Sequence, residues 1–500
     1  MPDRRTFLKL TGVTALPGTP ASRVAAVLDV DSRKQLFIDG RFLARRRGVD
    51  LVTHAPRKAG PVMLPERPWE RDRIGSYLSV IEHEGVLKMW YMSFAGKSGP
   101  HLCYATSADG IDWQRPATRV VEFDGSRENN IVLSPFKEGA VMLDSAAPAG
   151  ERFKTIASFG AKRSSALGTS HSGSLMLVTS RDGVHWDREY EVLPFHADSM
   201  NCLFWDGRIQ KYVAYLRGWN PLRVVVRGEI PREQILGQWP YRRGDRPRYL
   251  WNFLKADWPP AISTELPTVL AADALDPPHC DIYTPNVQPY PWAQDVYFAF
   301  PSLFRHTAPP GSERIPVAGV LDVQFAAGRD GIHWERYGRS PYVRLGLPGE
   351  LDSKGIYMGL GMIRRGGEIY QYYAGASADH GGGRGGSAIF RAVQRVDGFV
   401  SVAAGPSGGD LVTPHLRFAG RRLTLNVDTS ASGAVRVEVL GADGKPVPGF
   451  EMSNCRPVIG NEIAYQVNWE NAPDLSGMQQ DGVSLRFELR NAHLYAFQFL

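Results

Sequence analysis

Cysteine is scarce in this chain of 500 residues, which contains only four. Cys103, Cys202, Cys280 and Cys455 lie far apart, and no two of them have the C-x-x-C spacing that zinc sites use. A zinc site is therefore not expected. Three of the four stand beside apolar or aromatic strand residues, so the sequence leaves two alternatives open, buried free thiols or disulfides formed in an oxidising compartment.

Long hydrophobic runs and a strong excess of one charge are also missing. No apolar stretch reaches the roughly 18 residues that a membrane-spanning helix needs. The net charge is +6, and the first 26 residues hold four basic side chains against one acidic, which leaves +3 on the remainder. The basic clusters at 45–47 and 242–243 are not interleaved with aromatic residues that could stack on bases. We therefore predict neither a membrane span nor a nucleic-acid partner.

Glycine and proline, in contrast, are abundant, with 52 and 36 residues. Together they make up about 18% of the chain, against roughly 12% in an average protein. Hydrophobic residues at 43% and charged residues at 22% are typical of a globular protein and not of a disordered one. The composition predicts many turns and many short strands, and hence an all-β fold.

The N-terminus resembles a bacterial twin-arginine export signal. Arg4-Arg5 is followed by Phe7-Leu8-Lys9, although Asp3 stands where such signals usually have serine. A mildly apolar segment then runs to Ala26, with small residues suited to cleavage. The resemblance implies that 1–26 is a signal peptide, that the twin-arginine export machinery is a partner, and that the protein is periplasmic or extracellular. The alternative is an arginine pair that occurs by chance.

A phrase that recurs along the chain is the most informative feature. Ser107–Trp113, Ser180–Trp186 and Gly328–Trp334 share an Asp-Gly pair followed by tryptophan, and their tryptophans are 73 and 148 residues apart. A weakened copy stands at Val396–Phe399, and one copy is skipped near residue 260. A period of about 74 residues, repeated five times, spans Leu36–Gly405, and a fixed period of this kind indicates repeated supersecondary units.

Each unit has the pattern of a small β-sheet. Strand-forming runs recur at Val86–Met92, Lys211–Leu216, Asp295–Phe300 and Glu368–Tyr373, each after a shorter apolar run and a turn. The Asp-Gly pair between strands is typical of a hairpin. Four strands per unit around a common axis make a propeller blade, so we predict a five-bladed β-propeller over 36–405. The tryptophan of the phrase is expected to pack between adjacent blades.

The remaining segment, 406–500, lacks the repeat. Apolar and polar residues alternate at Leu423–Val427, Val435–Val439 and Val483–Leu489, which predicts strands with one solvent-exposed face. Asp443-Gly444 is a further turn. We predict a small C-terminal β-sandwich, so that the whole chain is all-β, a five-bladed propeller followed by a sandwich.

This arrangement resembles five-bladed glycoside hydrolases of the invertase/levanase (family 32) and arabinanase/xylosidase (family 43) types. The Leu36–Asp39 opening, the repeated Asp-Gly-x-His-Trp and the Asp397–Ser401 ending are similar to a group of exported bacterial proteins described as invertase-like, whose substrates are unassigned. The phrase also resembles the Asp-box of sialidases. The resemblance implies hydrolysis of a glycosidic bond by carboxyl groups in the propeller funnel.

Candidate site residues lie just before the innermost strand of each predicted blade, where propellers place their functional loops. Glycoside hydrolysis needs one carboxyl group as acid and a second as nucleophile or base. By blade position, the resemblance assigns these roles to Asp72, Glu138 and Asp198, although blade three has an aspartate where the resembled families have a glutamate acid. The predicted substrate-binding residues are His196, Asn201, Asp281, Tyr283, Asn286 and Asp352.

No cofactor is predicted. His196, His279 and His380 are interpreted as packed or sugar-contacting residues and not as metal ligands. The glycine-rich run after His380 is not followed by Lys-Ser/Thr, so it is not a phosphate-binding P-loop. Structural calcium at the propeller axis stays open as an alternative.

The sequence thus favours a secreted glycoside hydrolase acting on a poly- or oligosaccharide. A non-catalytic carbohydrate-binding propeller is the alternative, and the missing glutamate in blade three favours it. A third hypothesis is a structural surface protein whose C-terminal part mediates contacts.

Overall fold

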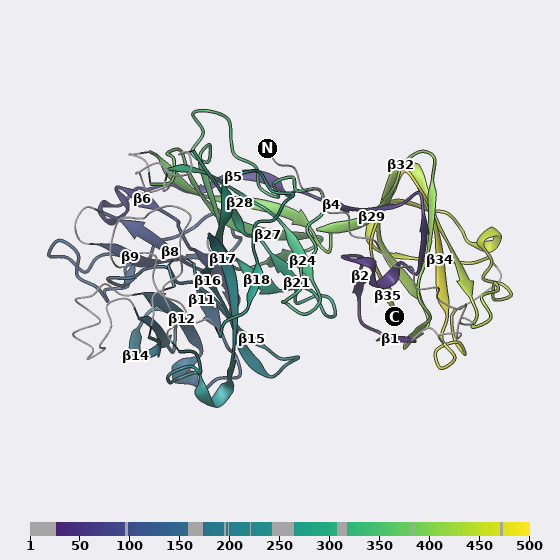
Figure 1. Cartoon of the computed structure of the whole chain (residues 1–500), viewed down its shortest axis with the longest axis horizontal. Helices are drawn as coiled ribbons and strands as arrows, with labels where there is room; N and C mark the ends of the chain where they lie inside the picture. Colours follow the sequence, from purple (N-terminus) through teal and green to yellow (C-terminus); the bar gives the residue numbers. More distant parts are fainter. Residues whose placement is uncertain are drawn as a thin grey trace, which may run out of the picture.

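The computed structural model describes residues 27–95, 99–158, 174–194, 197–198, 200–220, 222–242, 265–307, 318–381, 385–470 and 474–500. Two β-rich units lie next to each other, a larger one and a smaller one that contains both the C-terminus and the first N-terminal strands (Figure 1). The described residues form strands and short 3-10 turns. None of their helices is long and apolar enough to cross a membrane. The expected all-β class is confirmed.

Three sheets of the larger unit follow one another along the chain. The first contains β6 (Arg73–Ile74), β7 (Ser79–His83), β8 (Val86–Phe94), β9 (Pro100–Ser107) and β10 (Ile131–Leu133). The second contains β11 (Val141–Leu143), β12 (Phe153–Ser158), β13 (Leu175–Ser180) and β14 (Trp186–Leu193). The third contains β15 (Cys202–Asp206), β16 (Lys211–Trp219), β17 (Arg223–Pro231) and β18 (Thr268–Leu270). Each is an antiparallel sheet of the kind that the repeat predicted.

The fourth sheet is larger. It contains β19 (Cys280–Thr284), β22 (Ser302–His306), β23 (Gly319–Val323), β25 (Gly355–Met358), β26 (Ile363–Arg365), β27 (Glu368–Ala376), β28 (Ser387–Arg395) and β5 (Arg57–Met63). A three-stranded sheet accompanies it, formed by β20 (Val287–Pro289), β21 (Tyr297–Ala299) and β24 (Ala326–Gly328). The arrangement is propeller-like with four blades in place of the predicted five, because β23 and β25 pair in parallel at Leu321 and Gly355 and join the strands of two repeats.

The innermost segments of these sheets contact one another in a closed circle. Ser79 bridges Leu360 in parallel, and its hydroxyl accepts a hydrogen bond from the Val141 amide. Gly139 bridges Asn201 in parallel. Asn286 completes the circle, since its Nδ2 lies 4.0 Å from Sδ of Met200 and donates to the Met358 carbonyl at 2.8 Å. At the two parallel bridges, Ser79–Leu360 and Gly139–Asn201, the neighbouring innermost segments run in the same direction.

The recurring phrase connects neighbouring sheets. The carboxylate of Asp182 accepts from the amides of Val184 and His185, which shapes the loop 181–185 between β13 and β14. The carbonyl of Gly183 then accepts a hydrogen bond from Trp90 of the first sheet. Gly110 and Gly331 make the same contact with the hydroxyls of Tyr372 and Tyr215. Trp113 packs edge-on against Tyr372 of another sheet, as predicted.

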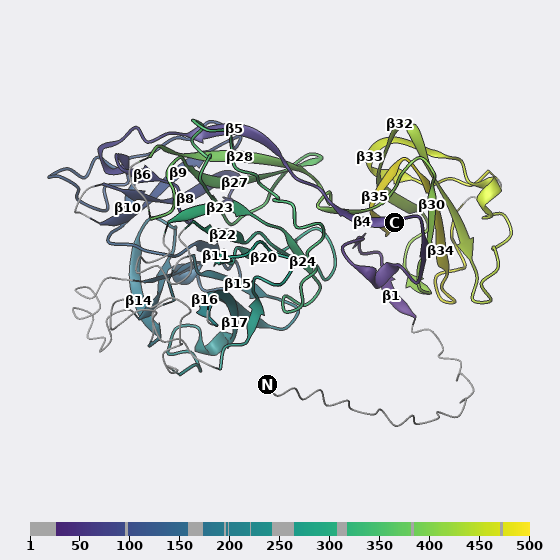
Figure 2. The same cartoon turned by 45° about the horizontal axis from the view of Figure 1, so that its top comes forward.

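The smaller unit has a core of its own. Its nine-stranded sheet contains β2 (Gln35–Leu36), β3 (Arg45–Arg47), β4 (Asp50–Thr53), β29 (Val400–Ala404), β30 (Gly409–Val412), β32 (Leu423–Leu440), β33 (Val458–Gln466), β34 (Ser484–Arg490) and β35 (Ala492–Phe499). A parallel pair, β1 (Leu28–Asp31) and β31 (Leu416–Phe418), accompanies it. The purple N-terminal strands thus lie among the yellow C-terminal ones (Figure 2), and the sheet crosses the predicted domain boundary at residue 405.

All four cysteines are buried and free, which decides between the two alternatives that the sequence left open. Burial raises the pKa of the Cys202 thiol to about 12, so the protonated form dominates at neutral pH.

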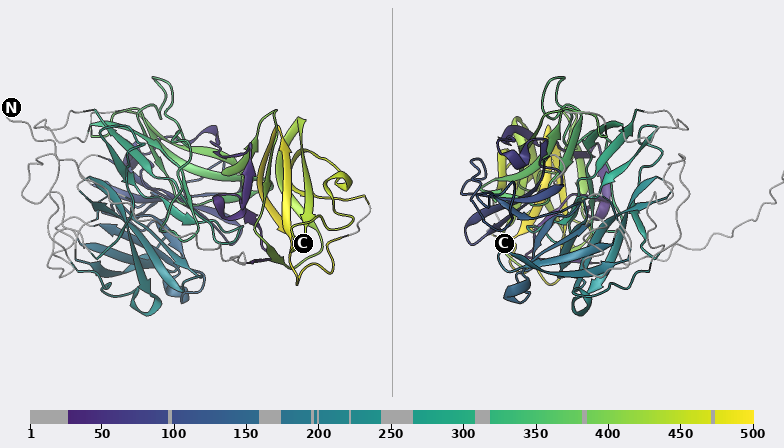
Figure 3. Two further views of the ribbon diagram at one scale, coloured as in Figure 1. Left: turned by 45° about the vertical axis from the view of Figure 1, so that its right-hand side comes forward. Right: turned by 90° about the vertical axis from the view of Figure 1, so that its left-hand side faces the viewer.

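The left view of Figure 3 shows the two units next to each other again, from a second direction.

Candidate functional site

The three predicted catalytic residues each precede a strand of a different sheet. Asp72 directly precedes β6, Glu138 lies three residues before β11, and Asp198 lies four residues before β15. Glu138 and Asp198 come just before the parallel bridge between Gly139 and Asn201, so they lie at the same end of two neighbouring innermost segments. The three carboxyl groups nevertheless have different surroundings.

Asp72 lies on the rim. Its side chain is 51% exposed, and its carboxylate is 3.4 Å from Nε of Arg71. Glu138, in contrast, is buried at 8% exposure with a positive φ of 68°. Its backbone carbonyl accepts hydrogen bonds from the amide and the Nδ2 of Asn201 at 2.8 and 3.1 Å. Glu138 is therefore fixed through its backbone to the innermost segment of the next sheet.

Asp198 lies at the centre of the site. Its Oδ2 accepts a hydrogen bond from Nη1 of Arg217 at 2.6 Å, and the arginine side chain is completely buried. The other Arg217 nitrogen, Nη2, donates to the carbonyl of Tyr283, and the guanidinium lies 4.2 Å from the centre of the Tyr283 ring. The side chain of Asp198 keeps 18% exposure. Asp198 is thus an accessible carboxylate held by a buried arginine.

Three tyrosines and a histidine surround this pair. The hydroxyls of Tyr77 and Tyr283 are 3.3 Å apart, and the ring of His380 lies 4.5 Å from that of Tyr283. The Tyr357 hydroxyl and Nδ1 of His380 are 2.7 Å apart. The three tyrosines are each less than 9% exposed, whereas His380 is half-buried. Aromatic faces with polar edges of this kind suit a polar ligand such as a sugar.

The electrostatics of the cluster keep His380 neutral. Burial, together with the charges of Arg223, Arg217 and Arg73, lowers the pKa of His380 to about 3, although the charge of Asp198 raises it. Burial, together with the Asp198 charge, also raises the pKa of the Tyr283 hydroxyl. Both groups are therefore uncharged at neutral pH, and they are available as hydrogen-bond donors or acceptors.

A second carboxylate lies deeper. Asp281 is fully buried, and its Oδ2 is 3.0 Å from Nη1 of Arg223 and 3.2 Å from Nε2 of His306. Burial alone would raise the pKa of Asp281, but the arginine and the histidine hold it below its usual value. The guanidinium of Arg223 also lies 5.5 Å from the centre of the Tyr283 ring, so this ion pair packs against the cluster.

The other predicted binding residues have structural partners. Asn201 and Asn286 are fully buried and link neighbouring innermost segments through their Nδ2 atoms. Asp352 accepts hydrogen bonds from Lys58 at 2.7 Å and from the Tyr373 hydroxyl at 2.9 Å, which puts it in a separate group. His196 lies outside the described residues. The structure therefore brings together Asp198 and Tyr283, with Asp281 behind them.

Sequence reasoning missed the arginines. Arg217 lies at the end of β16 and Arg223 begins β17, both within strand patterns that gave no sign of a site. Tyr77 and Tyr357 were not among the candidate residues, whereas His380 was interpreted as a packed or sugar-contacting residue. The one available signal was an arginine in an otherwise apolar strand, since a buried charge needs a partner.

Among the residues that the structure describes, no group of three or more His, Cys, Asp or Glu side chains could hold a metal ion.

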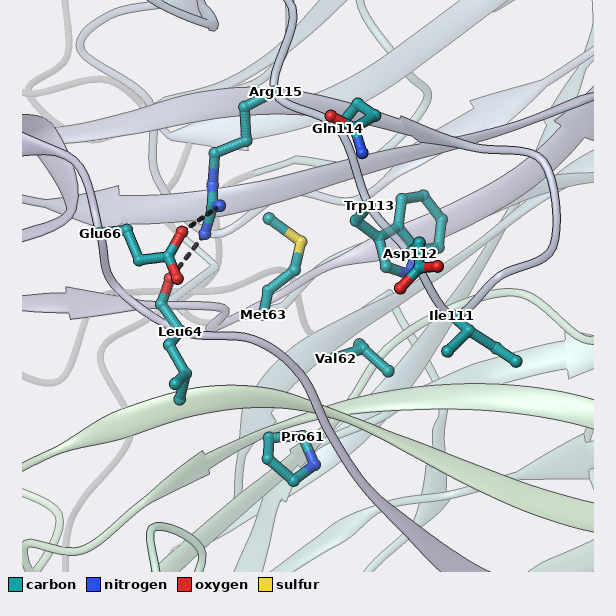
Figure 4. Close-up of a pocket in the computed structure, with 10 residues that line it drawn as sticks. All are labelled: Pro61, Val62, Met63, Leu64, Glu66, Ile111, Asp112, Trp113, Gln114 and Arg115. Atoms are coloured by element: carbon teal, nitrogen blue, oxygen red, sulfur yellow. Dashed lines mark hydrogen bonds and ion pairs between the residues drawn. The ribbon is translucent and has the colours of Figure 1, made fainter.

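A cavity of about 390 Å³ lies elsewhere, between the end of β5 and the loop 111–115. Figure 4 shows Arg115 directed toward Glu66 across the mouth, at 3.1 Å, with Met63 and Trp113 behind. Arg115 also reaches Glu70 at 3.0 Å. The charge of Arg115 is thus neutralised by Glu66 and Glu70. None of the predicted site residues lines this cavity.

No protein-family model matches this chain, and no curated protein matches its sequence. Among solved structures it is similar to an N-acetylgalactosamine deacetylase from F. plautii in complex with blood group B trisaccharide. That match has 13% identity and a TM-score of 0.43, and it covers 70% of this chain and 96% of the other. An α-L-arabinofuranosidase from Podospora anserina in complex with cellotriose matches with 12% identity and a TM-score of 0.41, and the match covers 68% of this chain and 97% of the other. A glycosyl hydrolase from Bacteroides ovatus matches with 14% identity and a TM-score of 0.42, and the match covers 73% of this chain and 97% of the other. Values this low leave the activity open, so function has to be argued from this chain's own residues.

Proposed function

We propose that this protein is a carbohydrate-active propeller protein, a glycoside hydrolase whose site is the cluster around Asp198. The observation that carries the proposal is an accessible carboxylate, paired with Arg217 and surrounded by Tyr77, Tyr283 and His380. Aromatic rings can stack on a sugar, and the carboxylate can act at the glycosidic bond.

The ion pair with Arg217 changes the role assigned to Asp198. A guanidinium at 2.6 Å favours the ionised carboxylate, which suits a nucleophile or base better than an acid. The proton donor then has to be Asp72 or Glu138. In this scheme the donor protonates the leaving oxygen as the glycosidic bond breaks, and Asp198 attacks the anomeric carbon or takes a proton from the attacking water.

Turnover by the mature chain would test this function. We would incubate residues 27–500 with a panel of polysaccharides and aryl glycosides and measure the reducing ends released. Asp198→Asn should lower kcat by at least about 100-fold, the usual size of an acid–base contribution. Asp187→Asn, on the exposed face of β14, is the matched control and should keep full activity. Unchanged turnover in Asp198→Asn would reject the assignment.

A carbohydrate-binding propeller without turnover is the second candidate. One observation favours it, since both central carboxylates, Asp198 and Asp281, are engaged by arginines. Binding on a glycan array with no reducing ends released from the bound glycan would select this function over hydrolysis.

We also propose that the eight-stranded sheet corresponds to two repeat units, so that five units surround the axis. The contacts of the innermost segments support this, because Asn286 and Met358 belong to different repeats and yet are neighbours at the axis. The division into a propeller at 36–405 and a C-terminal sandwich at 406–500 stays a prediction, although strands from 35–53 and 400–404 pair within the C-terminal sheet.

Export is a further part of the proposal. Arg4 and Arg5 lie outside the described residues, and their role rests on the resemblance to a twin-arginine signal. Replacing both with lysine should retain the protein in the cytoplasmic fraction of an expressing bacterium. Unchanged export of the double variant would reject the twin-arginine route.

A further inference from the structure

Arg73 differs from the other two arginines of the site. Arg217 and Arg223 are buried and each is paired with an aspartate, at 2.6 and 3.0 Å. Arg73 begins β6, directly after Asp72, and is half-buried. Its guanidinium lies 4.2 Å from the centre of the Phe94 ring, and it forms no ion pair with any residue in the described ranges. One cation at the mouth of the site is thus not neutralised by a described carboxylate.

Positive charge predominates around His380. The charges of three arginines, Arg223, Arg217 and Arg73, lower its pKa, and one carboxylate, Asp198, raises it. Arg73 belongs to this field, because its charge also lowers the pKa of Tyr357. A region in which positive charge predominates attracts anions.

We propose that the site takes a negatively charged sugar and that Arg73 binds its anionic group, a uronate carboxylate or a sulfate ester. This inference rests on the proposed carbohydrate function and specifies its substrate class. Stacking on Phe94 fixes the plane of the guanidinium, so its paired N–H groups are pre-oriented for a two-point contact with carboxylate or sulfate oxygens. Tyr77, His380 and Asp198 are placed to contact the hydroxyl groups of the same sugar.

The experiment compares three sets of oligosaccharides of equal length, one built from uronic acids, one sulfated and one uncharged. Their affinities for residues 27–500 would be measured by calorimetry at low and high salt. We expect one charged set to bind roughly 10- to 100-fold more tightly than the uncharged set, the size of a charge-assisted hydrogen-bond pair. Raising the salt should weaken this preference, because the rim of the site is solvent-exposed. The set that binds more tightly identifies the anion.

Two variants of Arg73 isolate its contribution. Arg73→Gln should reduce the affinity for the charged set to that for the uncharged set and leave uncharged binding unchanged. Arg73→Lys keeps the charge but loses the planar contact. Its affinity for the charged set should therefore lie between that of the parent and that of Arg73→Gln. Arg119→Gln, an exposed arginine paired only with Glu128, is the matched control and should bind as the parent does. Thermal unfolding of each variant checks that the fold is intact.

Two outcomes would overturn the inference in distinguishable ways. Equal binding of charged and uncharged sugars, unaffected by Arg73→Gln, would reject the anionic substrate and leave the carbohydrate function standing. Absence of binding and turnover with all three sets and with the polysaccharide panel would reject the proposed function together with this inference.

Discussion

At the scale of single residues, three carboxylates of the larger unit are each matched by a cation. Asp198 has Arg217, Asp281 has Arg223, and Asp352 has Lys58. Moving an ion out of water costs several kcal/mol, which only a close partner offsets. The partners come from distant positions in the chain, so a carboxylate that looks free in the sequence can be fully engaged in the fold.

The histidines near the contact between the two units give a prediction of pH dependence. Nε2 of His54 is 2.8 Å from Oγ of Ser401, which is 3.1 Å from Nδ1 of His493. Burial, together with the charges of His493 and Arg395, lowers the pKa of His54 to about 4, although the charge of Asp428 raises it. The pKa of His54 in the folded protein is below the unfolded value of 6.5. The contribution of His54 to the free energy of unfolding is therefore complete above pH 6.5 and is lost as the pH falls toward 4.

We therefore expect the free energy of unfolding to decrease by about 1–2 kcal/mol more in the parent than in His54→Gln between pH 7.5 and 4.5. Urea unfolding at the two pH values measures the difference. His333→Gln is the control, because the His333 side chain is 86% exposed. Equal losses in the parent and in His54→Gln would show that His54 does not titrate as proposed.

At the scale of elements, the recurring phrase explains how the sheets are held to one another. Its aspartate shapes the loop, and its glycine presents a carbonyl to an aromatic donor on the second strand of a neighbouring sheet. The Gly183 contact allows no side chain, since an added Cβ would lie 2.4 Å from the Trp90 ring. The phrase recurs because each sheet has to make the same contact with its neighbour.

Replacement of Gly183 by alanine should therefore destabilise the propeller by about 2–4 kcal/mol, the sum of an overpacked contact and a strained positive φ. Gly85→Ala is the matched control. Gly85 has a similar φ of 75° but no atom within 4 Å of an added Cβ, so it should lose only about 1 kcal/mol. Chemical denaturation measures both, and equal losses would mean that the inter-sheet contact contributes nothing.

At the scale of the whole molecule, the N-terminal strands tie the two units together. β5 pairs with β28 and completes the eight-stranded sheet, although their residues are more than 300 positions apart. β2 pairs with β35, and β4 pairs with β29, so the nine-stranded sheet includes strands from both ends of the chain. Both units therefore depend on residues distant in sequence, a topology typical of slow folding.

This topology predicts that residues 406–500 do not fold alone. Without β29 and β2, both hydrogen-bonding partners of β35 within 27–405 are missing and its edge is left unpaired. Circular dichroism of the isolated fragment should show no cooperative unfolding, whereas residues 27–500 should unfold with a clear transition. A cooperative transition in the fragment would show instead that the C-terminal strands are an independent domain.

The accuracy of the sequence interpretation differs between strands and site. The starts of β8 at Val86 and of β27 at Glu368 were predicted at their observed positions, because short-range alternation and turn residues determine strands locally. Two predicted C-terminal strands, Leu423–Val427 and Val435–Val439, are in fact parts of the single strand β32. The arginines of the site left no local pattern, so only Asp198, Asp281, Tyr283 and His380 of the cluster were named in advance.

The sequence by itself determined the all-β class, the repeat, and which end of each unit carries the candidate loops. These follow from turn chemistry and from a period that is visible along the chain. Only the tertiary structure decided that four blades replace the five expected, that Asp198 is held by Arg217, and that Asp352 is held by Lys58. The physical reason is that strand pairing between repeats and the pairing of buried charges join residues distant in the chain, and no local pattern records them.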